Sequence, residues 1–213
     1  MMRRGRRRVE NPATARRILA AAEEHFAAQG MAGARTEEIA VAAHANKAML
    51  YYYFGNKSRL HRAVLENLFR QLRKVALAPA PRSATPRDRL FAWVNGYFDF
   101  LATHPNYPRL VQREAMNMTP EFEWIVREYF RPFHRRLVAI IEDGVAAGEF
   151  RKVDPHQTVF TLLGTTVFYF AAAPVMSRMS GQNVLSPQGL ETRRRALLDF
   201  LSHGLFRSQA RSR

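Results

Sequence analysis

The chain has 213 residues, and its 47% hydrophobic and 24% charged side chains are typical of a folded globular protein with a buried core. Lys and Arg number 33 against 18 Asp and Glu, a formal net charge of +15, which favours polyanionic partners such as nucleic acid, acidic lipid or acidic protein. The absence of cysteine excludes a disulfide scaffold, thiolate zinc sites and a cysteine nucleophile. No apolar signal segment follows the basic N-terminus and no apolar run is long enough to span a bilayer, so we expect a cytoplasmic protein with no membrane partner.

The positive charge is concentrated towards the N-terminus. Residues 1–78 carry 15 basic and 6 acidic side chains, a net +9, whereas the longer stretch 79–213 carries 18 and 12, a net +6. The first eight residues include a run of arginines. A run of like charges is usually a solvated, disordered tail, but an arm that lies along phosphates or enters a minor groove is the alternative. The arm contains five arginines: Arg3, Arg4, Arg6, Arg7 and Arg8.

Prolines indicate where the helices begin. Five of them follow a residue whose side chain can cap a helix, and proline suits the first helical position because its missing N–H would have no partner there. These pairs are Asn11-Pro12, Thr85-Pro86, Thr119-Pro120, Asp154-Pro155 and Ser186-Pro187. Alternating strand patterns are nearly absent, so the sequence predicts an all-α protein. We expect helices near 12–29, 36–43, 47–54, 57–77, 86–103, 106–117, 120–147, 155–176 and 187–206, with 120–147 kinked or divided at Pro132.

Two short predicted helices, 36–43 and 47–54, have the spacing of a helix-turn-helix. In that motif a small residue lies four positions before a tight turn and ten before a buried aliphatic residue, and Ala40, His44 and Leu50 have those spacings. The turn residue has a positive φ, which glycine adopts most readily and histidine tolerates. Asn46 would then cap the second helix.

The second of these helices has two unlike faces at 100° per residue. One face is apolar and includes Leu50. The other offers a cation, a small residue and two phenols, which suits insertion into the major groove of DNA, although core aromatic residues are the alternative for the tyrosines. This second face consists of Lys47, Ala48, Tyr51 and Tyr52. Lys57 opens the next predicted helix, where its ammonium and free backbone N–H groups are placed to grip a phosphate.

Residues 14–60 resemble the DNA-binding domain of the tetracycline-repressor (TetR) family of transcriptional regulators. The matching features are Ile18-Leu19-Ala21-Ala22, Phe26-x-x-x-Gly30, Glu38-Ile39-Ala40, Asn46-Lys47, Leu50-Tyr51 and Phe54-x-x-Lys57-x-x-Leu60. His44 in place of Gly and Arg35 in place of the frequent Thr depart from the family pattern, and Thr36 is the better candidate for a phosphate contact at the start of its helix. The resemblance implies a three-helix N-terminal helix-turn-helix domain followed by a larger helical domain for dimerisation and ligand binding.

The resemblance also implies a function: a homodimeric repressor in the nucleoid of a bacterial cell, bound to a double-stranded DNA operator and released by a small effector. The many aromatic residues of the larger domain favour an apolar or aromatic effector. The expected divisions of the chain are a disordered basic arm (1–10), the DNA-binding domain (11–57), a connecting helix (58–78), the ligand-binding and dimerisation domain (79–207) and a disordered tail (208–213). The expected DNA contacts are Arg35, Thr36, Asn46, Lys47, Ala48, Tyr51, Tyr52 and Lys57.

The larger domain carries two features that fit these expectations. Apolar stripes on helices 155–176 and 187–206 favour a four-helix interface between two subunits, with packing onto the chain's own core as the alternative. The interface residues would be Val159, Leu163, Gly164, Thr166, Leu197 and Leu201. Aromatic residues interspersed with polar ones in the middle helices are typical of a ligand pocket. We expect that pocket to include Phe91, Asn95, Phe98, Arg113, Asn117, Trp124, Thr165 and Tyr169.

Two other functional classes fit the sequence less well. An enzyme is disfavoured because the seven histidines show no metal-ligand pairing at helical spacing, and neither a nucleophile motif nor a glycine-rich phosphate loop is present. We therefore expect no catalytic residues, metal or cofactor. A binder driven by charge alone, on DNA or on a membrane surface, would explain the arginine-rich arm but not the helix-turn-helix spacing; selective binding to a palindrome would distinguish the two.

Overall fold

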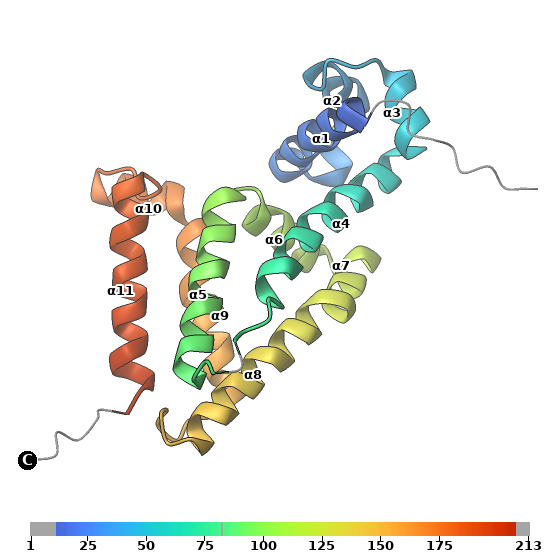
Figure 1. Ribbon diagram of the computed structural model, residues 1–213. Coiled ribbons are helices and arrows are strands. Elements are labelled where there is room, and N and C mark those ends of the chain that lie inside the picture. Colours follow the sequence, from blue (N-terminus) through green and yellow to red (C-terminus); the bar gives the residue numbers. More distant parts are fainter. Residues whose placement is uncertain (1–11, 82, 208–213) are drawn as a thin grey trace, which may run out of the picture. The chain divides into compact units, whose positions relative to one another are not determined.

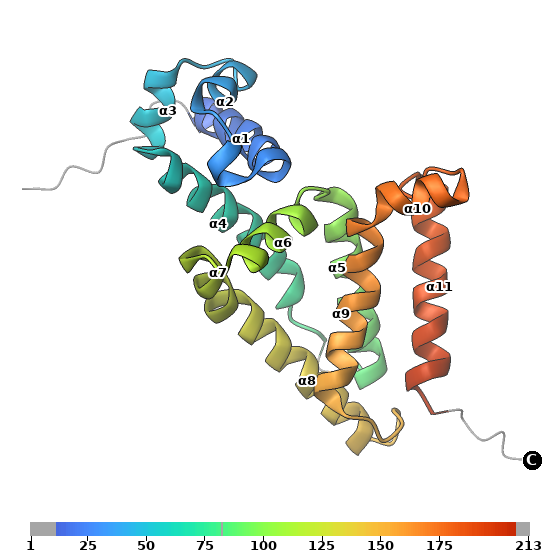
Figure 2. The same cartoon turned by 180° about the vertical axis from the view of Figure 1, so that it is seen from behind.

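The computed structural model describes residues 12–81 and 83–207 (Figures 1 and 2). The arginine-rich arm, Asn11 and the tail 208–213 lie outside the described residues. Within them the chain is helical, without a strand; its only β-type pairing is an isolated bridge between Phe150 and Phe206. The all-α prediction is therefore confirmed.

The helices follow the predicted ones closely. They are α1 (Pro12–Gly33), α2 (Thr36–Ala42), α3 (Lys47–Phe54), α4 (Lys57–Ala76), α5 (Pro86–Thr103), α6 (Tyr107–Asn117), α7 (Pro120–Ile125), a π-helical turn (Val126–Phe130), α8 (Arg131–Ala146), α9 (Pro155–Ala171), α10 (Ala173–Ser180) and α11 (Pro187–Leu205). In four of the expected caps the side chain accepts a hydrogen bond from the backbone N–H three residues on, because that N–H has no partner inside its own helix. The four caps are Thr85, Thr119, Asp154 and Ser186.

Two helices are interrupted near a proline, as predicted for 120–147 but not for 155–176, and α1 runs on to Gly33, beyond its expected end at residue 29. The helix expected over 120–147 is divided by the π-helical turn, in which the Arg131 N–H donates to the carbonyl of Val126, five residues back. Pro132 has no N–H to donate to residue 128 and its ring would crowd that carbonyl, so a wider turn is favoured just before it. The helix expected over 155–176 breaks at Ala172, and Pro174 lies at the start of α10, which continues to Ser180.

The chain divides into two compact units between Leu68 and Phe69, inside α4. This boundary lies about ten residues beyond the end expected for the DNA-binding domain, because the first half of α4 completes the core of the first unit. There, α1 packs on α2 and α2 on α3. The buried ring of His61, on α4, meets Phe26 of α1 edge-on with 4.9 Å between ring centroids.

The second unit is built around α5, α8 and α9, since α5 packs on both α8 and α9 and α8 packs on α9 (Figure 2). Phe98 of α5 and Phe170 of α9 meet with 5.1 Å between ring centroids. At the far end of α8 the ring of Phe150 lies directly on Gly144, where an added Cβ would come within 2.2 Å of it. The missing side chain of Gly144 is therefore required for this packing.

Candidate DNA-binding surface and ligand cavity

The turn between α2 and α3 has the predicted geometry. His44 has a φ of 49°, the left-handed conformation that the motif spacing requires. Asn46 caps α3, with its Oδ1 accepting a hydrogen bond from the Met49 N–H at 2.8 Å. Ala40 and Leu50 are both buried, so the two helices meet through these residues. The structure confirms the helix-turn-helix.

The two faces of α3 also agree with the prediction. Leu50 is fully buried, whereas the side chains of Tyr51 and Tyr52 are 39% and 45% exposed, and Lys47 and Ala48 are exposed as well. Tyrosine rings that served the core would be covered by other residues. The cation, the small residue and the two phenols of this face are therefore open to a partner outside the chain.

Lys47 forms an ion pair with Glu37, a residue that was not among the expected site residues. Its ammonium donates a hydrogen bond to the Glu37 carboxylate on α2. This contact lowers the pKa of Glu37 and raises the pKa of Lys47, because each charge stabilises the other. The Lys47 nitrogen also lies 5.8 Å from the centroid of the Tyr51 ring. One expected DNA contact is thus paired with an acid of the neighbouring helix.

The other four expected DNA-contact residues all interact with neighbours in the first unit, and among them Arg35 has a largely exposed side chain. Thr36 is only 7% exposed, and its hydroxyl lies 3.4 Å from the Tyr51 hydroxyl, so it supports that tyrosine from inside the unit. Lys57 donates to the carbonyl of Ala32 at 3.1 Å. Arg35 is exposed, with its guanidinium 4.0 Å from the Glu38 carboxylate. Asn46 uses its side-chain oxygen to cap α3, as described above.

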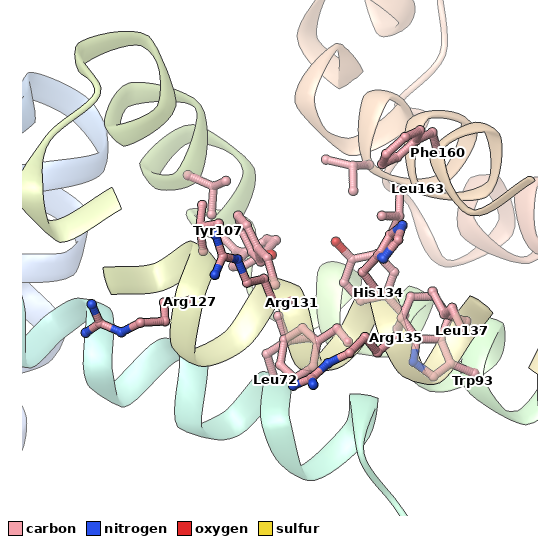
Figure 3. Close-up of a pocket in the computed structure, with 16 residues that line it drawn as sticks. Leu72, Trp93, Tyr107, Arg127, Arg131, His134, Arg135, Leu137, Phe160 and Leu163 are labelled. Atoms are coloured by element: carbon pink, nitrogen blue, oxygen red, sulfur yellow. The ribbon is translucent and has the colours of Figure 1, made fainter. Parts of the chain in front are cut away.

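The second unit contains a cavity of about 910 Å³ (Figure 3). Residues of α4, α5, α6, α8, α9 and the π-helical turn line it. Most of the lining side chains are aromatic or aliphatic: Leu72, Trp93, Tyr97, Tyr107, Val111, Val126, Phe130, Phe133, Leu137, Phe160, Leu163 and Val167. The remaining four are basic or imidazole side chains: Arg127, Arg131, His134 and Arg135.

Two buried phenols supply polar atoms within this apolar lining. Tyr97 and Tyr107 are hydrogen-bonded to each other, and burial raises the pKa of both above the ordinary value for tyrosine, so both stay neutral. His134 lies on α8 with its Nε2 3.3 Å from Nδ1 of His156, a residue at the start of α9. The two histidines are 22 residues apart on different helices, so helical spacing within one segment does not predict the pair.

None of the eight expected pocket residues is among those that line the cavity. Asn95 instead accepts a hydrogen bond at 3.0 Å from Arg194 of α11, and that guanidinium also covers Phe98. Tyr169 donates to the carbonyl of Val184 at 2.6 Å. Two of the others make local contacts, since Thr165 donates to the Thr161 carbonyl and Asn117 to the Arg113 carbonyl. Phe91 meets Phe206 near the end of the described chain. Trp124 packs edge-on against Tyr129 and Arg113 is exposed.

One pattern in the sequence could have indicated the lining residues between 127 and 135. Arg127, Arg131 and Arg135 are spaced by four, which places them on one side of a helical path, interleaved with Phe130, Phe133 and His134. The aromatic residues of this stretch were expected to be ordinary core, since a ring in a pocket and a ring in a core follow the same helical spacing.

Four of the six expected dimer residues are buried inside the single chain. Val159, Thr166, Leu197 and Leu201 therefore stabilise the chain's own fold and are not available to a second copy. Leu163 lines the cavity. Gly164 is exposed, and a Cβ added there would meet nothing within 4 Å. The large exposed apolar side chains of these helices are Phe160, Phe168, Val175, Met179 and Phe200.

No single helix among residues 12–81 and 83–207 is both long enough and apolar enough to cross a membrane. The consecutive helices α9 and α10 meet that criterion only when taken together, by length and composition alone, and a bend of 69° separates them.

Comparison with known proteins gives matches along most of the chain. The family described as bacterial regulatory proteins, tetR family, matches residues 18–64, and the family described as tetracyclin repressor-like, C-terminal domain, matches residues 86–201. The HTH-type transcriptional repressor SCO4008 of Streptomyces coelicolor is 34% identical over 78% of this chain and 83% of its own length. The HTH-type transcriptional regulator RutR of Escherichia coli K12 is 27% identical over 77% of each chain.

Solved structures share the fold. The ketosteroid transcriptional regulator KstR2 of Mycobacterium tuberculosis superposes with a TM-score of 0.73 at 19% identity, covering 94% of this chain and 98% of that one. A transcriptional regulator from Saccharomonospora viridis, solved in complex with choline, superposes with a TM-score of 0.72 at 19% identity, covering 93% of this chain and all of that one.

Proposed function

The chain belongs to the TetR family of transcriptional regulators, and we propose that it is a homodimeric repressor that reads a pseudo-palindromic operator through α3 and leaves it when a small apolar or aromatic molecule enters the cavity. DNA binding and transcriptional regulation follow from the family. The dimer, the operator contacts and the release are the proposal. No catalytic step is assigned to the chain.

The observation that carries the DNA-reading part is the exposed face of α3. Lys47 provides a cation, Tyr51 and Tyr52 provide hydroxyl groups, and Ala48 allows close approach of the helix to the base edges. A helix with such a face fits the major groove, where side chains donate to phosphates and base edges. We assign the remaining contacts to Arg35, which is exposed, and to the helix start at Asn46, with Thr36 holding Tyr51 in place.

The dimer part rests on exposed apolar side chains of α9, α10 and α11. Phe168 is 64% exposed, Phe200 58% and Met179 82%, and such side chains favour burial against a partner. Gly164 and Gly204 leave open space along α9 and α11, as a close approach of two helices requires. We therefore place the contact with the second subunit on this surface, which we define by Phe160, Gly164, Phe168, Val175, Met179, Phe200 and Gly204.

Release is attributed to α4. Two residues separate this helix from the end of α3, and the helix runs without a break to Ala76 and contributes Leu72 to the cavity lining. Two recognition helices of a dimer must lie about 34–36 Å apart, one turn of DNA, to bind both half-sites. A ligand that binds more tightly to another spacing lowers DNA affinity by that difference, and DNA lowers ligand affinity by the same factor.

The test is selection of genomic DNA fragments by the purified protein, followed by sequencing and by sedimentation of the free protein and of the complex. We expect one enriched pseudo-palindrome bound by a dimer, with the mass of two chains per site. Enrichment without a common sequence would overturn the proposed operator reading and leave a binder driven by charge alone. A monomer that binds one half-site tightly would overturn the dimer.

A further inference from the structure

We propose that the cavity of the second unit takes an organic anion, with an apolar, ring-bearing body among the aromatic side chains and an acidic head group at Arg131 and Arg135. The inference rests on the proposed ligand site and adds the charge of the ligand, which that function leaves open. It concerns binding alone, so it can be tested without DNA.

The apolar part of the ligand follows from the lining. Twelve of the sixteen lining residues are aromatic or aliphatic, and the rings of Trp93 and Tyr97 lie 4.9 Å apart at the side formed by α5. A space of about 910 Å³ is at the upper end of the range that holds molecules of drug size. A body of two or more rings, or an equivalent hydrocarbon, fills such a space with the least loss of contact.

The charge follows from which ionisable residues line the cavity. Among its sixteen lining residues are three arginines and no aspartate or glutamate. A cationic ligand would meet the like charges of Arg131 and Arg135 with no acid in the lining to balance them, so choline, bound in the Saccharomonospora viridis structure, is the wrong kind of ligand for this lining. An acidic ligand would instead be attracted by the arginines and would meet no like charge in the lining.

The three arginines are not equally available. Arg127 is held by Glu128, with its Nε 2.8 Å from the carboxylate, and Figure 3 shows its side chain turned away from the others. The guanidinium groups of Arg131 and Arg135 make no hydrogen bond or ion pair with any residue of 12–81 or 83–207. They lie one turn apart on α8, and both side chains are exposed at the edge of the lining. Two unengaged guanidinium groups beside an apolar space can donate hydrogen bonds to a carboxylate, sulfonate or phosphate and so form a binding site for it.

Two further features favour an anion. Tyr97 and Tyr107 are neutral phenols hydrogen-bonded to each other, so one hydroxyl of the pair keeps a proton that it can donate to an acidic oxygen of the ligand. His134 lies between Arg131 and Arg135 in the sequence, and Figure 3 shows it turned towards Phe160 and Leu163. Its imidazole supplies another donor when its ring nitrogen carries a proton.

The experiment compares two probes with the same rings. One is 8-anilino-1-naphthalenesulfonate, an anion, and the other is N-phenyl-1-naphthylamine, its neutral counterpart; both gain fluorescence in apolar surroundings. We expect one site per chain and at least tenfold tighter binding of the anion. The double variant Arg131→Gln/Arg135→Gln should lower the affinity of the anion about tenfold and change that of the neutral probe less than twofold.

Two controls fix the meaning of the result. The variant Arg151→Gln/Lys152→Gln removes the same charge from exposed positions outside the lining and should leave both affinities unchanged. Leu163→Trp fills the cavity and should weaken both probes, which separates this site from the apolar surface of α9, α10 and α11. Circular dichroism checks that each variant keeps its helices.

Equal affinity of the two probes for the wild-type chain, or an equal loss of both in the arginine variant, would overturn the proposed charge of the ligand. Suppose that the chain prefers the anionic probe but that saturating amounts of this probe leave its affinity for the operator unchanged. That result would keep this inference and overturn the proposed release from DNA. The two failures are therefore distinguishable.

Discussion

The two units of this protein use the same kinds of side chain, basic groups and aromatic rings, on surfaces of opposite kind. On α3 the rings of Tyr51 and Tyr52 are exposed on the outside of a helix, and the nearby Lys47 is paired with Glu37. In the second unit the rings lie around a hollow of about 910 Å³, and the guanidinium groups of Arg131 and Arg135 have no acidic partner among the described residues.

The difference shows how the form of the surface selects the ligand. On the proposed function, an exposed helix face meets a large polyanion whose phosphates and base edges can reach it, and an acid such as Glu37 would oppose the binding of other anions there. A hollow lined with rings takes the apolar body of a small molecule, and free cations at its edge select the charge. Each of the following changes would alter one side of this comparison and leave the other unchanged.

The largest effect is expected from Phe168→Glu, which places a charge on the surface assigned to the dimer. Because a monomer engages one half-site, operator affinity should fall by about 100-fold or more, within the span that separates specific from non-specific binding. Sedimentation should show a monomer, and circular dichroism should show unchanged helicity. Gln182→Glu, an exposed loop position, is the matched control. A dimeric Phe168→Glu variant would place the interface elsewhere.

Lys47→Ala should weaken operator binding about 30-fold or more, since each of the two recognition helices loses a contact of roughly 1–3 kcal/mol. Because Lys47 is exposed, thermal stability should change by less than about 0.5 kcal/mol, as for other surface changes. Fluorescence anisotropy on the selected operator and thermal melting measure the two quantities. Lys74→Ala, an exposed lysine of α4, serves as the control. Wild-type affinity in Lys47→Ala would remove α3 from the proposed DNA contact.

Gly144→Ala should destabilise the second unit alone. Its Cβ would lie 2.2 Å from the Phe150 ring, and overpacking of this kind costs about 1–3 kcal/mol. Thermal melting and denaturant titration should both show the loss. Gly33→Ala, whose Cβ would have a nearest contact of 3.3 Å, should be far milder. A Gly144→Ala variant as stable as the wild type would show that Phe150 moves freely off α8.

The smallest effect is an increase in affinity. Glu37→Gln frees Lys47 and removes a negative charge near the DNA, so affinity for non-specific DNA should rise several-fold. The slope of log K against log salt should steepen by about 0.9 for each additional phosphate that the protein neutralises. Because the Lys47 contact lowers the pKa of Glu37 below its usual 4.5, the carboxylate stays charged above that pH and is lost only as the pH falls through the lowered value. The ratio of the variant's affinity to that of the wild type should therefore be constant at neutral pH. Unchanged non-specific binding would mean that Glu37 does not restrain Lys47.

The sequence was informative wherever structure depends on neighbours along the chain. The caps at Thr85 and Asp154, the positive φ of His44 and the two faces of α3 all follow from residues within one or two turns. The cavity depends instead on which side chains of α4, α5, α6, α8 and α9 meet, and helical spacing is the same for a ring in a core and a ring in a pocket. Asn95 resembled a pocket residue in the sequence because its partner, Arg194, lies 99 residues away.

The central claim, that occupation of the cavity and binding of DNA oppose each other, is tested most directly by two titrations with one ligand. Displacement of 8-anilino-1-naphthalenesulfonate selects the tightest-binding aromatic acid, which is then titrated into the free protein and into its complex with the selected operator. We predict weaker binding to the complex, by the same factor by which the saturating acid lowers operator affinity. Equal affinity in the two titrations would contradict the account.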